Sequence, residues 1–116
     1  MNAVEKLTQR RTEIVKEIAR LEPMRRGSVT EQFLTSTRRD GSKRKRGPYT
    51  VYSFKPGRKT ASRRLRSDRQ RTLYRQQIEA FRRFERLAAE LVEVSQQLAD
   101  WAVGTEEGEE KKRLRS

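Results

Sequence analysis

The stretch GPYTVYSFKPGRKTASRR, residues 47–64, decides the fold of this chain. Aromatic and β-branched side chains fill most of residues 49–54, and the sequence Lys-Pro-Gly-Arg follows them. Pro56 fixes φ at the first central position of a turn, and Gly57 tolerates the positive φ that a type II turn requires at the second. We therefore predict a β-hairpin over this stretch.

The predicted hairpin combines aromatic rings with cations. Side chains alternate along a strand, so Thr50, Tyr52 and Phe54 share one face of the first strand and the residues between them share the other. One face must be buried against a helix, so most of the aromatic rings belong to the core and only one or two are free to stack on bases. The second strand adds four cations, which are Arg58, Lys59, Arg63 and Arg64.

The positive charge of the chain is concentrated in its middle. The formal net charge is +13, and residues 23–66 hold 14 basic and 2 acidic side chains, a net charge of +12. Residues 1–22 carry a net charge of +1, whereas residues 67–103 and 104–116 are each neutral. A basic block between two nearly neutral segments is typical of a binding surface for a polyanion.

The composition argues against several classes of function. Only 32% of the 116 residues are hydrophobic, which predicts a thin core. The chain has no histidine and no cysteine, so the usual general base and the usual metal ligands are missing. No apolar run is long enough to cross a bilayer, and residues 1–6 do not resemble a signal peptide. We expect a non-enzymatic cytoplasmic protein without cofactor or metal, associated with the nucleoid or with a ribonucleoprotein, and not with a membrane.

A first helix is predicted at residues 2–22. Asn2 is a good N-cap residue, and Glu5 stands three positions later as in a capping box. Pro23 is expected to end the helix, because the residue before a proline avoids helical geometry. An apolar stripe with a heptad-like spacing predicts a seam facing a partner helix, and it comprises Val4, Leu7, Ile14, Ile18 and Leu21.

A second, longer helix is predicted at residues 67–103. Ser67 serves as its cap, and Gly104 is expected to stop it. We expect the first helix to cover its apolar stripe from about Phe84 to Trp101, and the sheet to cover residues 73–81. The remaining residues, 104–116, are predicted to form a charged tail outside the core.

The segment between the first helix and the hairpin contains two more predicted features. Residues 26–35 are rich in β-branched and aromatic side chains, with Val29, Glu31 and Phe33 on one face and the residues between them on the other, and they predict a strand; a short helix capped by Ser28 is the alternative. Residues 36–46 hold six cations and no apolar residue. We predict a mobile arm here that becomes ordered on a ligand, with a solvated loop of no function as the alternative.

Together these elements predict an α+β fold. Two long antiparallel helices form a helical hairpin or coiled coil, and a small antiparallel β-sheet or β-hairpin is inserted between them. The expected single domain spans residues 1–103, with the basic β-hairpin region at residues 27–66.

Short motifs of the chain resemble a family of small uncharacterised bacterial and archaeal proteins often encoded beside transposases and other mobile elements. The motifs are RGSVTEQF at residues 26–33, GPY at 47–49, GRKT at 57–60 and FRRF at 81–84, within a similarity over about residues 24–100. The family carries a cysteine cluster before GPY, and residues 35–46 of this chain contain no cysteine. The resemblance implies a mobile-element or phage context and no established activity, and the family's metal-binding role is not carried over.

Nucleic-acid binding is the function that the sequence predicts. Arginine and lysine on a loop and a strand contact phosphates, and the partner is DNA or RNA. The alternative is a helical accessory subunit that forms a homodimer or docks on a larger protein or nucleoprotein complex. A strand-cleaving tyrosine is disfavoured, because no further acid–base groups accompany the tyrosines. The candidate nucleic-acid-binding residues are Arg25, Arg26, Arg38, Arg39, Lys43, Arg44, Lys45, Arg46, Tyr49, Tyr52, Lys55, Arg58, Lys59, Arg63, Arg64, Arg66, Arg69 and Arg71.

Overall fold

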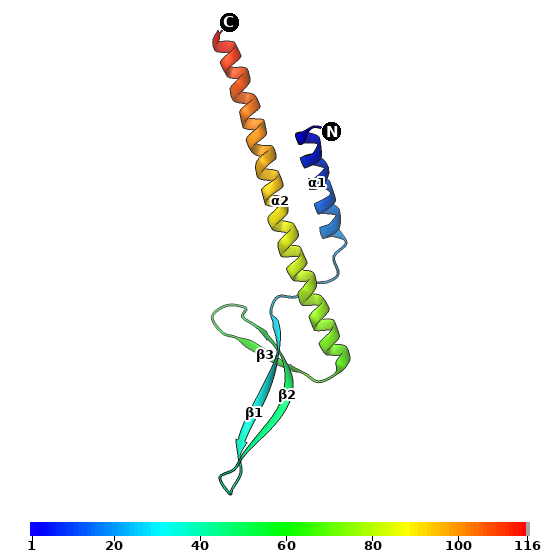
Figure 1. Cartoon of the computed structure of the whole chain (residues 1–116), viewed down its shortest axis with the longest axis vertical. Helices are drawn as coiled ribbons and strands as arrows, with labels where there is room; N and C mark the ends of the chain where they lie inside the picture. The colour runs from blue at the N-terminus through cyan, green and yellow to red at the C-terminus, as the bar shows by residue number, and fades with distance from the viewer. Residues whose placement is uncertain (116) are drawn as a thin grey trace. The chain divides into compact units, whose positions relative to one another are not determined.

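The α+β prediction is confirmed. A computed structural model describes residues 1–115 and has two helices and three strands (Figure 1). Their order along the chain is α1 (Ala3–Ala19), β1 (Ser28–Thr37), β2 (Lys43–Phe54), β3 (Ala61–Leu65) and α2 (Asp68–Arg115). The chain divides into two compact units: a helical unit of Met1–Leu21 with the chain from Arg83 onward, and a sheet unit of Glu22–Arg82.

The first helix begins as its capping signal predicts. The backbone N–H of Glu5 donates to Oδ1 of Asn2 over 2.8 Å, so Asn2 is the N-cap. The predicted end at residue 22 is wrong, because α1 ends at Ala19. The N–H groups of Arg20 and Leu21 bond the carbonyls three residues earlier, which tightens the last turn and closes the helix before the proline is reached.

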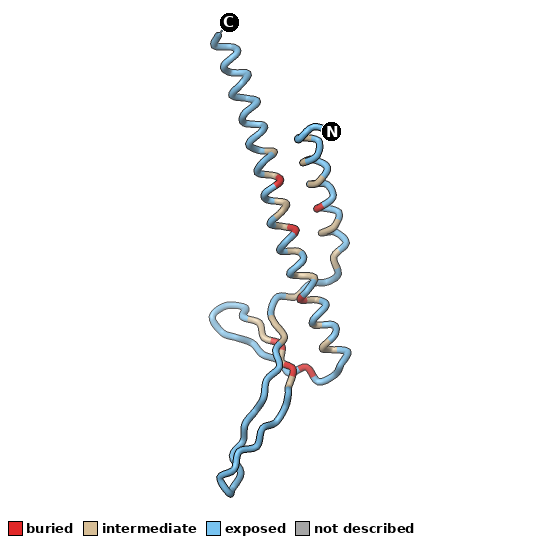
Figure 2. The backbone as a smooth tube through the Cα atoms, in the orientation of Figure 1, coloured by how far each residue is buried: buried red, intermediate tan, exposed pale blue. Residues whose placement is uncertain are grey.

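Within the helical unit, α1 and α2 pack along the predicted seam. Ile14 is fully buried against Leu87 and Val94, and partly buried side chains surround them, which are Leu7, Ile18, Leu21, Leu91 and Leu98. Figure 2 shows buried and half-buried positions along the parts of the two helices that lie next to each other. The predicted cover as far as Trp101 is wrong, since Leu98 is the last contributor and the Trp101 side chain is 54% exposed.

An ion pair flanks this seam. Nε of Arg10 lies 2.5 Å from Oε2 of Glu90, and its Nη2 donates to Oε1 over 2.7 Å. The hydrogen bond from Arg10 holds the pKa of the Glu90 carboxyl below its ordinary value of 4.5, and the same bond raises the pKa of Arg10. The pair therefore joins α1 and α2 through a bidentate, charge-assisted hydrogen bond between guanidinium and carboxylate.

The second helix does not stop at Gly104 but continues to Arg115, so the predicted end of this helix is wrong, whereas residues 104–115 are all exposed and lie outside the core as expected. A glycine inside a helix costs only about 1 kcal/mol. Against that cost, Glu107 and Glu109 stand four residues before Lys111 and Arg113, a spacing that stabilises helices. The start of α2 is as predicted, because Oγ of Ser67 accepts the N–H of Gln70 over 3.1 Å. None of the helices in residues 1–115 is long and apolar enough to cross a membrane.

The sheet unit contains a three-stranded antiparallel sheet in the order β1-β2-β3. The strand predicted within residues 26–35 is confirmed, and its helical alternative is wrong. The predicted tight turn at Pro56-Gly57 is also wrong, because Phe54 pairs with Ala61 and leaves residues 55–60 as a longer loop.

The predicted mobile arm is instead a continuation of the hairpin. Thr35 pairs with Lys45 and Thr37 with Lys43, so residues 36–46 form the end of β1, a turn and the beginning of the antiparallel strand β2. The turn is closed by the N–H of Arg38, which donates to the carbonyl of Ser42 over 2.7 Å. β-branched threonines favour the strand. The Asp-Gly sequence favours the turn, since the carboxylate of Asp40 accepts both the N–H and the hydroxyl of Ser42.

The core of the sheet unit lies between the sheet and the first part of α2, as predicted. Tyr52, Leu65 and Ile78 are buried together, with Val29, Phe54 and Tyr74 packed against them. The rings of Tyr52 and Tyr74 meet edge to face with centroids 4.9 Å apart. The hydroxyl of Tyr52 donates to the carbonyl of Arg26, which fixes the chain as it enters β1.

Candidate nucleic-acid interface

The face of the sheet opposite this core, here called the outer face, is the first part of the interface. Because Tyr52 points into the core, its neighbour Val51 points to the outer face, and the register pairs Val51 with Arg64 of β3. The guanidinium of Arg64 lies over the ring of Tyr49 at 3.9 Å from the ring centroid. This cation–π contact fixes a positive charge on the outer face.

A β-bulge between β1 and β2 extends this face into the hairpin. Gln32 pairs with Tyr49 and Leu34 with Arg46, so two residues of β2, Gly47 and Pro48, stand opposite Phe33 alone. Gly47 has φ +123°, and a Cβ there would lie 2.8 Å from the carbonyl oxygen of Gln32. Only glycine fits this backbone without strain.

The bulge decides which way the arginines of β2 point. In an unbroken strand Arg44 and Arg46 would share the core-facing side with Tyr52. The extra residue reverses the alternation, because Arg46 is opposite Leu34 and Arg44 opposite Ser36, and both β1 residues follow Gln32 on the outer face. Arg44, Arg46 and Arg64 therefore lie on one face of the sheet unit.

The outer part of the hairpin, residues 33–46, is here called the ribbon. Its opposite face carries Lys43 and Lys45, and Nζ of Lys45 lies 4.1 Å from the ring centroid of Phe33. Every residue of the ribbon is exposed. The turn adds Arg38 and Arg39, and among the described residues the side chains of Lys43, Arg44 and Arg46 have no ion-pair or hydrogen-bond partner.

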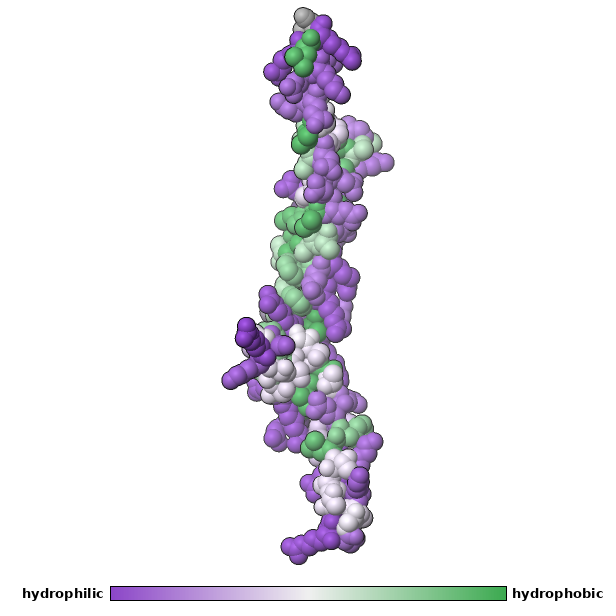
Figure 3. All heavy atoms as spheres, turned by 90° about the vertical axis from the view of Figure 1, so that its left-hand side faces the viewer, coloured by the Kyte–Doolittle hydropathy of each residue, from purple (hydrophilic) through white to green (hydrophobic). Residues whose placement is uncertain are grey.

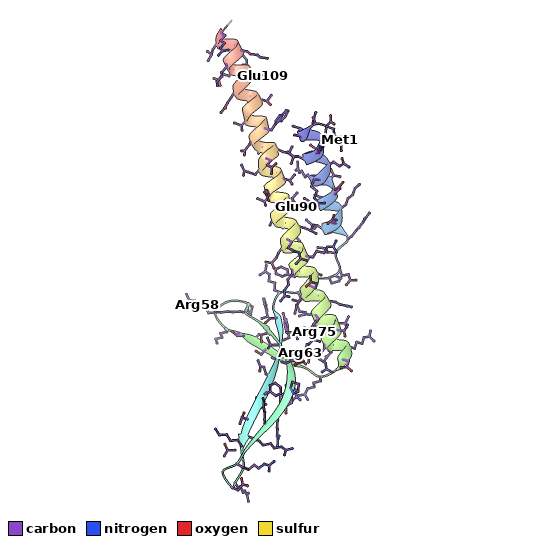
Figure 4. All side chains as sticks on the ribbon, in the orientation of Figure 1. Met1, Arg58, Arg63, Arg75, Glu90 and Glu109 are labelled. Atoms are coloured by element: carbon purple, nitrogen blue, oxygen red, sulfur yellow. The ribbon has the colours of Figure 1, made fainter. Side chains whose placement is uncertain are left out.

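Other predicted residues lie apart from the ribbon. Lys55, Arg58 and Lys59 are exposed on the loop between β2 and β3, where Figure 4 shows Arg58 pointing away from the sheet. Arg66 and Arg69 are exposed around the start of α2. A hollow of about 220 Å³ opens beside the outer face near the start of α2, and its lining includes Tyr49, Arg64, Arg66 and Arg71.

Several predicted residues are committed to holding the fold. The guanidinium of Arg25 lies 4.4 Å from the ring centroid of Tyr74, and its Nε donates to Oε1 of Gln77 over 2.9 Å. Arg71 is bonded to Asp68 and to the carbonyl of Leu65.

Three more predicted residues make contacts within the sheet unit. Arg63 donates to the hydroxyl of Tyr74 over 3.3 Å, and Arg26 lies over the ring of Phe81 at 5.9 Å. Tyr52 is only 8% exposed with its hydroxyl bonded, so it has no free ring face for a base. We therefore leave Tyr52 out of the proposed interface, whereas the assignment of Arg25 to it stays a prediction.

The sequence reasoning missed the bulge and the two exposed apolar residues beside it. Phe33 and Leu34 are 50% and 57% exposed, one on each face of the ribbon. The available signal was the Gly-Pro pair at residues 47 and 48, because glycine and proline inside a strand pattern mark bulges. Within residues 1–115, no cluster of acidic side chains is arranged to hold a metal ion.

Comparison of the chain with protein-family models, with curated proteins and with solved structures found no match. The resemblance to proteins encoded beside mobile elements therefore stays a prediction.

Proposed function

We propose that this chain is a non-enzymatic nucleic-acid-binding protein whose ribbon and outer face contact the phosphate backbone. One observation carries the proposal: Arg44, Arg46 and Arg64 share the outer face, and Lys43 and Lys45 occupy the reverse of the same ribbon. We place its action in the cytoplasm, at the nucleoid or a ribonucleoprotein, and in a mobile-element or phage context.

The charge balance around the ribbon supports this proposal. Residues 23–66 contain two acidic side chains, Glu31 and Asp40. Asp40 is engaged by Ser42, whose hydroxyl lowers the pKa of the Asp40 carboxyl, and Glu31 pairs across the sheet with Thr50. Cations left without acidic partners in water remain available to phosphates, and releasing the counterions of the nucleic acid drives such binding.

The test is a salt titration of binding to labelled nucleic acid, followed by fluorescence anisotropy. The variant replaces the four ribbon cations by alanine, which are Lys43, Arg44, Lys45 and Arg46. A matched control removes the same charge from exposed positions on α1 and its C-cap, which are Lys6, Arg11, Lys16 and Arg20. We expect the ribbon variant to bind more weakly with a flatter salt dependence, by about 0.7–0.9 in the log–log slope for each lost phosphate contact. Equal affinities and slopes for the two variants would contradict the proposal.

A second candidate function is docking on a protein partner through α2. Val92, Trp101 and Val103 are each more than half exposed, and Figure 3 shows apolar surface on the helical unit. Exposed aromatic and branched side chains of this kind are common in protein interfaces. A complex of this type survives high salt, whereas nucleic-acid binding through the ribbon does not, so pull-down at low and high salt separates the two functions.

A further inference from the structure

We propose that the nucleic acid is B-form duplex DNA and that the ribbon inserts into its major groove. This inference rests on the proposed function and specifies its ligand. The observation behind it is that the ribbon carries cations on both faces, with Arg44 and Arg46 on one and Lys43 and Lys45 on the other.

Cations on both faces of the ribbon are suited to a groove that is bordered by a phosphate backbone on each side. A surface that lies flat on one strand uses the cations of one face only. A ribbon between two phosphate backbones contacts one backbone with each face. The major groove of B-form DNA is about 12 Å wide and admits a two-stranded ribbon.

The length of the ribbon and its hydrogen-bonded turn are compatible with insertion into such a groove. Four residue pairs extend beyond the bulge, from Leu34 with Arg46 to Thr37 with Lys43. At about 3.3 Å per residue they reach roughly 13 Å, against a groove depth of about 8.5 Å. The closed turn presents Arg38 and Arg39 at the leading end, where guanidinium groups can bond guanine edges.

The rings of the sheet unit argue against the other ligands. Binding of single strands relies on aromatic faces on which bases stack. Here Tyr52 is buried, and the guanidinium of Arg64 already lies over the ring of Tyr49. Double-stranded RNA is disfavoured because the major groove of an A-form helix is too deep and narrow for side chains to enter.

The test reverses charge on one face at a time. One variant carries Lys43→Glu and Lys45→Glu, the second carries Arg44→Glu and Arg46→Glu, and the control carries Arg11→Glu and Lys16→Glu on α1. All three change the net charge equally, and thermal melts establish that each is folded. We expect both ribbon variants to lose at least about tenfold in affinity for duplex DNA, and the control to lose less than about threefold. Loss in only one ribbon variant would overturn groove insertion.

The parent protein is then titrated with duplex DNA, with duplex RNA of the same sequence and with one DNA strand. We expect duplex DNA to bind at least about tenfold more tightly than the other two, and to resist netropsin, which occupies the minor groove. Equal or tighter binding of RNA or of the single strand, or displacement by netropsin, would overturn the inference and leave the proposed function standing. Absence of salt-dependent binding to all three would overturn both.

Discussion

At the scale of the residue, Gly47 has the largest consequence for function. Its positive φ allows the bulge, and the bulge places Arg44 and Arg46 on the same face as Arg64. An alanine at this position would need both a rare backbone conformation and space that the Gln32 carbonyl occupies.

We predict that Gly47→Ala destabilises the protein by about 1–3 kcal/mol and weakens nucleic-acid binding. Gly57→Ala is the matched control, because a Cβ at Gly57 meets no atom within 4 Å. Urea unfolding measures the difference between the two variants. Equal stability of both would show that the bulge imposes no strain on alanine.

The hydroxyl of Tyr52 provides a second test at this scale. Tyr52→Phe removes the bond to the carbonyl of Arg26, and we expect a loss of about 1–2 kcal/mol with binding unchanged. Tyr49→Phe serves as control, since no hydrogen bond of its hydroxyl is found in residues 1–115. A drop in affinity for Tyr52→Phe at full stability would instead place Tyr52 in the interface.

At the scale of the element, capping residues in the sequence predicted where the two helices begin better than where they end. Asn2 and Ser67 cap the two helices as their neighbours indicate, because a cap is a contact within four residues. The end of α2 could not be predicted from Gly104, since charge pairs spaced along the following turns offset the cost of one glycine.

The pairing of strands was harder to predict from the sequence than the composition of the candidate site. The cations of residues 36–46 were found from composition, but their division between two faces depends on the register with β1. That register depends on the bulge, and one inserted residue reverses every side chain beyond it. The structural role of Arg25 also depends on contacts with Tyr74 and Gln77, which are distant in the sequence.

The helix seam gives a prediction at this scale. Ile14→Ala should destabilise the protein by about 2–5 kcal/mol, because Ile14 is fully buried against Leu87 and Val94. Val92→Ala, at a position 67% exposed on α2, should change stability by less than about 0.5 kcal/mol. Thermal or urea melts that overlay for both variants would mean that the two helices do not pack along this seam.

The ion pair between α1 and α2 predicts a dependence on pH. Because the folded-state pKa of Glu90 lies below its ordinary value of 4.5, the pair stabilises the fold above that value. This contribution is lost as the pH falls through the lowered pKa of the folded state. Urea midpoints measured from about pH 7 to about pH 3 should therefore fall less steeply for Glu90→Gln than for the parent. Parallel curves would show that the Arg10 contact is absent in solution.

At the scale of the whole molecule, charge is divided between the parts of the chain. Residues 23–66 hold 12 of the 13 excess positive charges, and residues 87–103 hold acidic side chains and no basic ones. This distribution predicts that nucleic acid contacts the sheet unit and leaves the seam of the helical unit undisturbed.

The most direct test is an NMR titration of the ¹⁵N-labelled protein with a short DNA duplex, which follows every backbone amide at once. We predict that the largest shifts fall in the ribbon, residues 33–46, and on the outer face at Tyr49, Val51 and Arg64. Amides of α1 and of α2 beyond Leu87 should keep their positions. Shifts concentrated in those helices, with the ribbon amides unchanged, would contradict the account.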